Sequence, residues 1–251
     1  MAERLSGISV FFPCYNDGGS IAEVVRRVLS VLPAVAETYD ITVVDVGSTD
    51  DAPAVLDALR QELPTVSVIR HERNRGYGGA LRTGFEAATK EFVFYTDGDG
   101  QYDPREMTKL TALMRDGIGL VNGYKLNRAD AFYRKITGGT YEWMARRVFG
   151  IRIKDVDCDF RLMRTAYTRQ VSLTFESGAI GLELVYSLQS AGCGMVETGV
   201  HHYPRMHGRS EFFSLRHVTN LIVDVARFWW GVHRPGARRN VVLPPAEELT
   251  S

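Results

Sequence analysis

Two aspartates, Asp97 and Asp99, stand two residues apart in a short glycine-containing segment. Carboxylates at this spacing on a tight turn can converge on one point, where their like charges repel unless a cation lies between them. Oxygen ligands with open coordination positions suit Mg²⁺ or Mn²⁺, which in turn hold substrate phosphates. A polar turn that caps the next helix is the alternative, but Asp103 before Pro104 already stands at that helix start. The pattern therefore favours a divalent metal site.

A buried strand is expected to position these aspartates. Residues 92–96 are apolar or β-favouring, and the Asp97–Asp99 turn follows directly at the carboxyl end. In open α/β sheets, ligands bind at that edge of the sheet. The turn is therefore placed where a ligand site is expected.

Strands and helices alternate in the first half of the chain, which predicts a parallel sheet covered on both faces. Strands are predicted at residues 8–12, 41–46, 66–69, 92–96, 118–122 and 195–202. Helices are predicted at residues 20–32, 53–63, 80–88, 140–149, 181–190 and 212–231. Residues 124–139 are polar and contain glycine, so we expect a loop there. No Walker or G-x-G-x-x-G motif follows a strand, which disfavours a P-loop or dinucleotide fold.

Composition excludes several classes of protein. The 251 residues carry 30 acidic and 30 basic side chains, so the zero net charge gives no indication of a nucleic-acid partner. The cysteines are Cys14, Cys158 and Cys193, an odd and scattered set that suits a reducing compartment without disulfides. We expect neither a signal peptide nor a membrane span, since the first residues are short and polar and no apolar run reaches the roughly 18 residues that a span needs.

Residues 96–104, TDGDGQYDP, resemble the Asp-x-Asp segment of family 2 glycosyltransferases, and most closely the polyprenyl-phosphate (dolichol-phosphate type) sugar synthases. The likeness runs from about Ile8 to Ser210. It implies a single α/β domain of the GT-A type, Rossmann-like, with a mostly parallel sheet and helices on both faces. We expect this domain at residues 1–210, an amphipathic helix at 211–233 and a flexible tail at 234–251. By resemblance, Asp97, Asp99 and Gln101 hold Mg²⁺ or Mn²⁺, and Asp97 could instead contact the nucleotide.

The first strand ends in a segment that resembles the family's Pro-x-Tyr-Asn-Glu motif, with Asp17 in place of the glutamate. The resemblance implies that Pro13, Tyr15 and Asp17 line the base and ribose of the nucleotide. An ordinary strand-exit turn with a helix cap is the alternative. Arg75 and Gly76 resemble the family's Asn-Lys/Arg-Gly loop, which implies close approach of the backbone to the donor's phosphates.

The second strand ends at Asp45, where the family has Val-Asp-Asp-Gly-Ser and this chain has Val46 in place of the second aspartate. A carboxylate could accept the ring N–H of the base, whereas valine cannot. Asp45 takes that role, or stacking and backbone groups hold the base; a loop-capping role for Asp45 also stays open. The choice between a UDP and a GDP donor is therefore open.

Three carboxylates alternate at Asp155, Asp157 and Asp159, so on an extended segment they would share one face. Like charges on one face are costly without cations nearby. The segment resembles the family's Asp-x-x-x-Gly-Phe-Arg/Lys, with Asp159 where glycine is common. Asp155 then matches the candidate general base near the acceptor. Arg161 matches the family's basic residue, which implies that it binds phosphate or the acceptor. A solvated edge strand is the alternative.

A late loop resembles the Arg-x-x-Gly-x-Ser loop that closes over phosphates in these synthases. It supplies Arg205, Arg209 and Ser210. Planar guanidinium groups suit phosphate binding. An ordinary basic loop is the alternative.

Taken together, these motifs predict an inverting, metal-dependent hexosyl- or N-acetylhexosaminyltransferase, with Asp99 and Asp155 as catalytic residues. The donor is a nucleotide diphosphate sugar and the acceptor a polyprenyl phosphate. Two other hypotheses stay open: transfer to a small soluble hydroxyl compound, and a catalytically silent nucleotide-sugar-binding protein, which Val46 makes conceivable.

The stretch 212–231 carries an apolar stripe at helical spacing, with Trp229 and Trp230 at one end. The stripe consists of Leu215, Val218, Leu221, Ile222, Val225, Phe228 and Trp229. Such a stripe packs on the sheet or lies in a membrane interface. Because a lipid acceptor is met at a bilayer, we expect peripheral attachment at the cytoplasmic, inner face of the membrane. A small membrane-spanning partner could strengthen that attachment.

Overall fold

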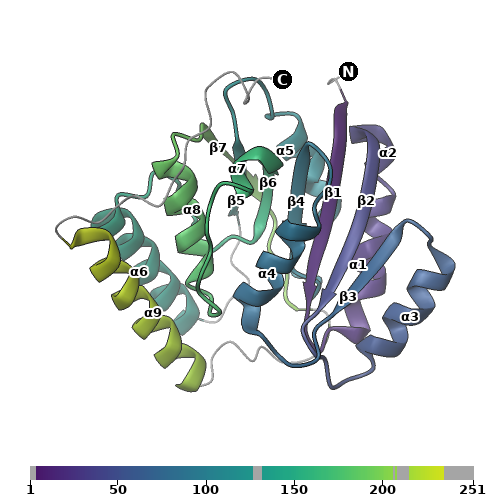
Figure 1. Cartoon of the computed structure of the whole chain (residues 1–251), viewed down its shortest axis with the longest axis horizontal. Helices are drawn as coiled ribbons and strands as arrows, with labels where there is room; N and C mark the ends of the chain where they lie inside the picture. Colours follow the sequence, from purple (N-terminus) through teal and green to yellow (C-terminus); the bar gives the residue numbers. More distant parts are fainter. Residues whose placement is uncertain (1–3, 127–131, 206, 208–214, 235–251) are drawn as a thin grey trace.

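A seven-stranded sheet runs through the centre of the protein, with helices on both faces (Figure 1). The computed structural model describes residues 4–126, 132–205, 207 and 215–234. Strand order is β3-β2-β1-β4-β6-β5-β7. The strands are β1 (Leu5–Cys14), β2 (Ala36–Asp45), β3 (Val66–Arg70), β4 (Phe92–Thr96), β5 (Leu120–Lys125), β6 (Phe160–Arg164) and β7 (Met195–Val200). Only β6, among these strands, runs antiparallel to its neighbours, β4 and β5. The predicted mostly parallel α/β domain is confirmed.

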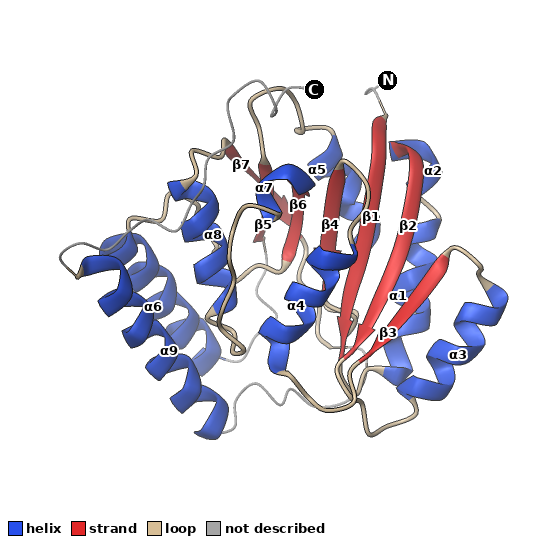
Figure 2. Ribbon diagram, viewed as in Figure 1, coloured by secondary structure: helices blue, strands red, loops and turns tan. Residues whose placement is uncertain are grey.

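Two helical layers bury the sheet (Figure 2). The helices are α1 (Gly18–Leu29), α2 (Leu32–Val35), α3 (Ala52–Glu62), α4 (Gly76–Ala87), η1 (Pro104–Glu106), α5 (Met107–Thr111), α6 (Phe132–Phe149), α7 (Thr165–Thr168), α8 (Ile180–Ser190) and α9 (Leu215–His233). On β1, Val10 and Phe12 share a core with α1, α3 and α5, whereas Phe11 packs with α4 and α8. Because both faces of β1 are buried, its second half, residues 10–14, is a continuous apolar run rather than an alternating pattern.

The second half departs from the prediction in two places. Helix α6 begins at Phe132, inside the stretch expected to be a loop. Strand β6 lies in the middle of the sheet, although its sequence also suited a solvated edge strand. Its register with β4 pairs Thr96 with Phe160, which brings the two strand ends next to each other. This antiparallel insertion shapes the site described below.

Helix α9 lies beside α6 at one end of the molecule rather than on the sheet (Figure 1). Phe228 stacks on Phe149 of α6, with ring centroids 5.3 Å apart, and also contacts Tyr186 of α8. The opposite side of α9 leaves Ile222 and Trp230 more than half exposed, at 62% and 67%. No helix in the described ranges has both the length and the apolarity needed to cross a bilayer.

Candidate active site

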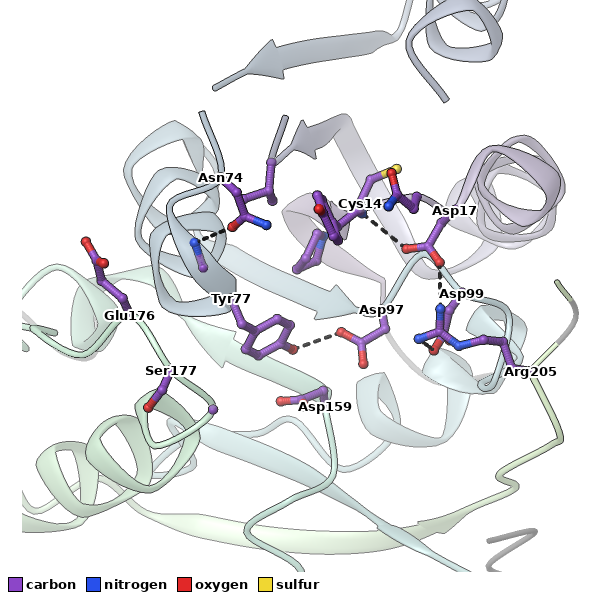
Figure 3. Close-up of a pocket in the computed structure, with 16 residues that line it drawn as sticks. Cys14, Asp17, Asn74, Tyr77, Asp97, Asp99, Asp159, Glu176, Ser177 and Arg205 are labelled. Carbon is purple, nitrogen blue, oxygen red and sulfur yellow. Dashed lines mark hydrogen bonds and ion pairs between the residues drawn. The ribbon is translucent and has the colours of Figure 1, made fainter. Parts of the chain in front are cut away.

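The carboxyl ends of β1, β2 and β4 open into a cavity of about 220 Å³ (Figure 3). The start of α4, the residue before β6 and the segment before α8 complete its wall. The cavity holds seven of the residues predicted from sequence: Pro13, Tyr15, Asp17, Gly76, Asp97, Asp99 and Arg205. These residues are far apart in the chain, and the sheet brings them together at the edge where α/β proteins bind ligands.

One end of the cavity is formed by Tyr15, Asn16, Val46 and Asn74. Asn16 adopts a left-handed backbone conformation, with φ of 57°. Its side-chain oxygen accepts hydrogen bonds from the backbone N–H groups of Thr49, at 2.8 Å, and Asp50, at 3.3 Å. Asn16 therefore ties the loop after β1 to the loop after β2, and asparagine tolerates this conformation better than most residues.

Asp45 does not line this end of the cavity. Its buried carboxylate accepts the backbone N–H of Ser48 at 2.9 Å and lies 3.8 Å from the guanidinium of Arg70. These contacts match the loop-capping alternative. Val46 does line the cavity, so an apolar side chain faces the space where the family pattern has a carboxylate.

The glycine-rich turn at the start of α4 has a packing role. A Cβ on Gly78 would lie 1.9 Å from the carbonyl oxygen of Phe175, and one on Gly76 would lie 2.3 Å from that of Glu176. The N–H of Gly78 donates to the Glu176 carbonyl at 3.0 Å. These glycines thus let the segment before α8 reach the turn and close the cavity wall. Arg75, predicted to meet phosphate, is exposed and lies outside the lining.

Four carboxylates line the cavity: Asp17, Asp97, Asp99 and Asp159. Arg205 bridges two of them, with 3.1 Å to Asp17 Oδ1 and 2.8 Å to Asp99 Oδ2. The Tyr77 hydroxyl donates to Asp97 at 2.9 Å (Figure 3). Arg161 lies behind the fourth carboxylate, with Nη1 3.6 Å from Asp159 Oδ1. Two guanidinium groups among four carboxylates leave an excess of negative charge in this cluster.

Burial, together with the neighbouring charges, raises the pKa of three of these carboxyl groups. Burial raises the pKa of Asp17 to about 6, and Arg205 opposes the rise. Burial is also the largest cause of the raised pKa of Asp97, followed by the charges of Asp159 and Asp99. The pKa of Asp159 is raised by burial, with Arg161 acting in the opposite direction. A cation in the cavity would relieve the repulsion.

Asp97 and Asp99 fit a divalent metal by their chemistry. Magnesium in proteins is usually held by one or two carboxylates together with waters and substrate phosphates. In the described part of the chain, no three His, Cys, Asp or Glu side chains converge as a preformed ligand set. Gln101, the third predicted ligand, donates its side-chain amide to the Tyr203 carbonyl at 3.2 Å and lies outside the lining. The fit therefore rests on two carboxylates.

Asp155, the predicted general base, lies outside the cavity lining. Its buried carboxylate accepts the backbone N–H groups of Lys125 and Asp157, each at 3.1 Å. These bonds fold residues 155–157 into a turn, so the three alternating carboxylates do not share one face. Asp159 is the member of this set that faces the cavity.

Arg161, expected to bind phosphate, is fully buried inside the sheet instead. Its guanidinium donates to Asn122 Oδ1 at 2.8 Å, to the Val156 carbonyl at 2.6 Å and to the Tyr95 hydroxyl. With these contacts it connects β4, β5 and β6 and does not reach the cavity. Arg209 and Ser210 lie outside the described residues.

Some lining residues had no assigned role in the sequence interpretation. Tyr77 stands inside the motif used for Arg75, and Asp159 was visible as a departure from the family's glycine. Ser177 reaches the cavity from the segment before α8, and its hydroxyl donates to Asp224 of α9 at 2.7 Å. No local motif marks Ser177, because only the tertiary fold brings that segment to the site.

A mostly parallel sheet with a carboxylate cluster at its strand ends is the architecture of GT-A type transferases. The model of glycosyl transferase family 2 matches residues 9–171, and the chain belongs to this family.

Solved structures of glucosyl-3-phosphoglycerate synthase from Mycobacterium tuberculosis share the fold. The complex with Mg²⁺ and UDP aligns with a TM-score of 0.68 at 15% identity, covering 96% of this chain and 81% of that one. The complex with Mn²⁺, UDP-glucose and phosphoglyceric acid gives 0.66 at 17% identity, covering 96% and 82%. At this identity the likeness concerns the fold.

Proposed function

We propose that the protein transfers a sugar from a nucleotide diphosphate sugar with the help of Mg²⁺ or Mn²⁺. The observation that carries this proposal is the acidic cluster at the strand ends, where Asp97 and Asp99 face the cavity and Arg205 bridges Asp17 and Asp99. A divalent cation would offset the excess negative charge of the carboxylates, and a diphosphate would pair with the guanidinium of Arg205. Membership in family 2 and the metal-bound, UDP-bound neighbours support the same reaction class.

Different residues of this chain would bind different parts of the donor. Tyr15 and Val46 form an apolar surface for the nucleoside, so the base is held by stacking and backbone groups rather than by a carboxylate. Tyr77 fixes the orientation of Asp97 through its hydrogen bond. A bound metal ion would neutralise the charge that develops on the departing nucleotide diphosphate.

Arg205 supplies the mobile positive charge of the site. Its Nε is buried and has no hydrogen-bond partner among the described residues, although two other guanidinium contacts hold Asp17 and Asp99. A phosphate oxygen would satisfy that nitrogen. In this proposal Arg205 turns from the carboxylates to the diphosphate when the donor binds.

For the acceptor, a small soluble compound with a hydroxyl group has the better support. The similar synthase has been solved with UDP-glucose together with phosphoglyceric acid and with glycerol 3-phosphate, both of which are soluble phosphates. The expected polyprenyl phosphate acceptor has no such support from the neighbours.

Polyprenyl phosphate stays as a second candidate because of one observation on the surface. Trp143 of α6 and Ile222, Trp229 and Trp230 of α9 are large apolar side chains that the fold leaves exposed. Tryptophan favours the headgroup region of bilayers. An enzyme that meets a lipid phosphate needs a surface of this kind.

The donor and metal are tested by incubating the protein with UDP- and GDP-sugars and measuring release of the nucleotide diphosphate. Glycerol 3-phosphate, phosphoglyceric acid and polyprenyl phosphate in detergent serve as acceptors. We expect release that requires Mn²⁺ or Mg²⁺ and that falls by about 10²-fold or more in Asp99→Asn, since charge stabilisation in transfer reactions is of this size. UDP plus Mn²⁺ should also raise the melting temperature of the wild type, but not of Asp99→Asn.

Asp103→Asn is the matched control. Its carboxylate stands four residues further along the same loop and pairs with Arg105 at 2.6 Å, outside the cavity. This variant should keep wild-type release and the full metal-dependent melting shift. Undiminished turnover in excess EDTA would overturn the metal assignment. Donor binding without turnover on any acceptor would instead favour a silent binding protein.

A further inference from the structure

Asp159 occupies a distinctive place at the strand ends. Because Thr96 of β4 pairs with Phe160 of β6, Asp97 and Asp159 are the next residues beyond this pair on the two antiparallel strands. Both carboxylates line the cavity, and Figure 3 shows Asp159 near Asp97 and on the far side of it from Cys14 and Asp17. The side chain of Asp159 keeps 20% of its surface exposed, so it is reachable from the cavity.

The side chains of Tyr95 and Arg161 hold the carboxylate of Asp159 in place on the side away from the cavity. The Tyr95 hydroxyl donates to Asp159 Oδ1 at 3.2 Å, and Arg161 Nη1 lies 3.6 Å from the same oxygen. Arg161 is itself fixed by Asn122, Tyr95 and the Val156 carbonyl. The shorter contacts of Arg161 are thus to neutral groups, which means that Asp159 is not its principal hydrogen-bond partner. The Tyr77 hydroxyl, which donates to Asp97, also interacts with Asp159. The Asp159 carboxylate still lines the cavity, where a donor group of a ligand can reach it.

The positions of the lining side chains along the cavity determine which part of a bound ligand lies next to Asp159. The strand order β2-β1-β4-β6 sets their positions. The apolar Tyr15 and Val46, which follow β1 and β2, lie at one end, and Asp97 and Asp99, which follow β4, form the charged middle with Arg205. A nucleotide sugar is a linear molecule of base, ribose, diphosphate and sugar. With its base at the apolar end and its diphosphate in the middle, its sugar falls beyond Asp97, where Asp159 and Ser177 lie (Figure 3).

We infer that Asp159 is a specificity-determining residue that accepts hydrogen bonds from hydroxyl groups of the transferred sugar. Sugar hydroxyls are donors, and an ionised carboxylate accepts from two of them at once. A fixed acceptor discriminates between epimers, because the wrong epimer leaves a buried polar group unpaired. The inference rests on the proposed function and adds the group that selects the sugar.

The test compares binding of nucleotides with and without a sugar by isothermal titration calorimetry in the presence of Mn²⁺. The probes are UDP, GDP, UDP-glucose, UDP-galactose, UDP-N-acetylglucosamine and GDP-mannose. In Asp159→Ala we expect affinity for the bare nucleotide to stay within about twofold of wild type. Affinity for the preferred nucleotide sugar should fall by about 10–100-fold, the value of hydrogen bonds to a charged group. The preference between UDP-glucose and UDP-galactose should shrink with it.

Two further variants keep the test decisive. Asp159→Asn preserves the shape of the side chain next to Arg161 and should show the same selective loss even if the alanine variant is poorly folded. Asp157→Asn is the control, since its half-exposed carboxylate pairs with Lys125 at 3.1 Å outside the cavity. This control should bind every probe as the wild type does.

The outcomes separate this inference from the function beneath it. If the wild type binds none of the nucleotide sugars, the proposed donor class is wrong and the inference falls with it. If the wild type binds them but both Asp159 variants lose nucleotide and nucleotide sugar equally, or lose neither, the sugar role of Asp159 alone is overturned.

Discussion

Buried carboxylates of the site, when ionised, destabilise the folded protein and favour the binding of a cation. Asp17 is 7% exposed, and burial raises its pKa to about 6. A carboxyl group whose pKa is higher in the folded state than in the unfolded state stabilises the fold below its unfolded pKa, near 3.8, and loses that contribution as the pH rises through 6. Ionisation of Asp17 at neutral pH therefore lowers the stability of the fold.

Asp17→Asn should remove this destabilisation, by an amount that depends on pH. Relative to the wild type, the variant's free energy of unfolding should rise between pH 4 and pH 7.5, by at most about 3 kcal/mol for a shift of about two pKa units. Urea denaturation in EDTA at several pH values measures it. At pH 4 the variant should show no such gain, and it loses the contact with Arg205. A stability difference that stays constant across this range would show that burial leaves Asp17 unperturbed.

At this scale the sequence was informative where function depends on local spacing. Asp97 and Asp99 were predicted because both follow one strand, and their convergence needs only a tight turn. Asp155 was assigned as the candidate general base and Asp159 received no role, whereas Asp159 is the one that lines the cavity. The hydrogen bonds of Asp155 with two backbone N–H groups decide which of these carboxylates faces it. Those bonds depend on Lys125 of a different strand, which no local pattern reveals.

At the scale of elements, β6 is the part that the fold depends on most and that the sequence showed least. It enters antiparallel between β4 and β5, and Arg161 stands fully buried at its start. Buried arginines are rare in strands, so alternating charges next to it looked like an exposed edge. The guanidinium instead satisfies a hydroxyl, an amide and a carbonyl from the surrounding segments. The parallel strands β1 to β4 were predictable because their apolar runs are continuous.

Arg161→Leu should destabilise the protein by about 3–5 kcal/mol, since it leaves several buried polar partners and Asp159 unmatched. Urea unfolding followed by circular dichroism gives the value. Arg26→Leu is the control for removing an arginine, because its ion pair with Glu62 joins side chains that are about half exposed. That change should cost less than about 1 kcal/mol. Equal losses in the two variants would contradict the structural role of Arg161.

At the scale of the whole molecule, the charge is balanced but its distribution is uneven. Exposed arginines near the apolar side chains of α6 and α9 are Arg146, Arg147, Arg227 and Arg234. The amphipathic character of α9 was predictable from its sequence, but the direction of its faces was not. Val225 and Phe228 pack inward as expected, whereas Ile222 and Trp229, on the same predicted stripe, face outward because the helix packs on α6 and α8.

This surface predicts binding to vesicles that contain anionic lipid, with weaker binding at high salt. Arg227→Glu should lower binding by about fivefold or more, since each basic residue at an anionic surface contributes roughly 1 kcal/mol. Trp229→Ser/Trp230→Ser should lower it further. Co-sedimentation measures both, and Arg60→Glu on α3, at the other end of the molecule in Figure 1, is the control. If the wild-type protein does not bind such vesicles, polyprenyl phosphate is excluded as the acceptor and the soluble acceptor is left.

The bridge from Arg205 to Asp17 and Asp99 has a consequence for the order in which ligands enter. A cation that arrives alone competes with an arginine already in place. A nucleotide diphosphate offers that guanidinium another anion and so frees the carboxylates for the cation. Because coupling between two ligands is reciprocal, the cation strengthens nucleotide binding by the same factor. Under the proposed function, metal and nucleotide thus bind with positive cooperativity, and the donor enters most readily as its metal complex.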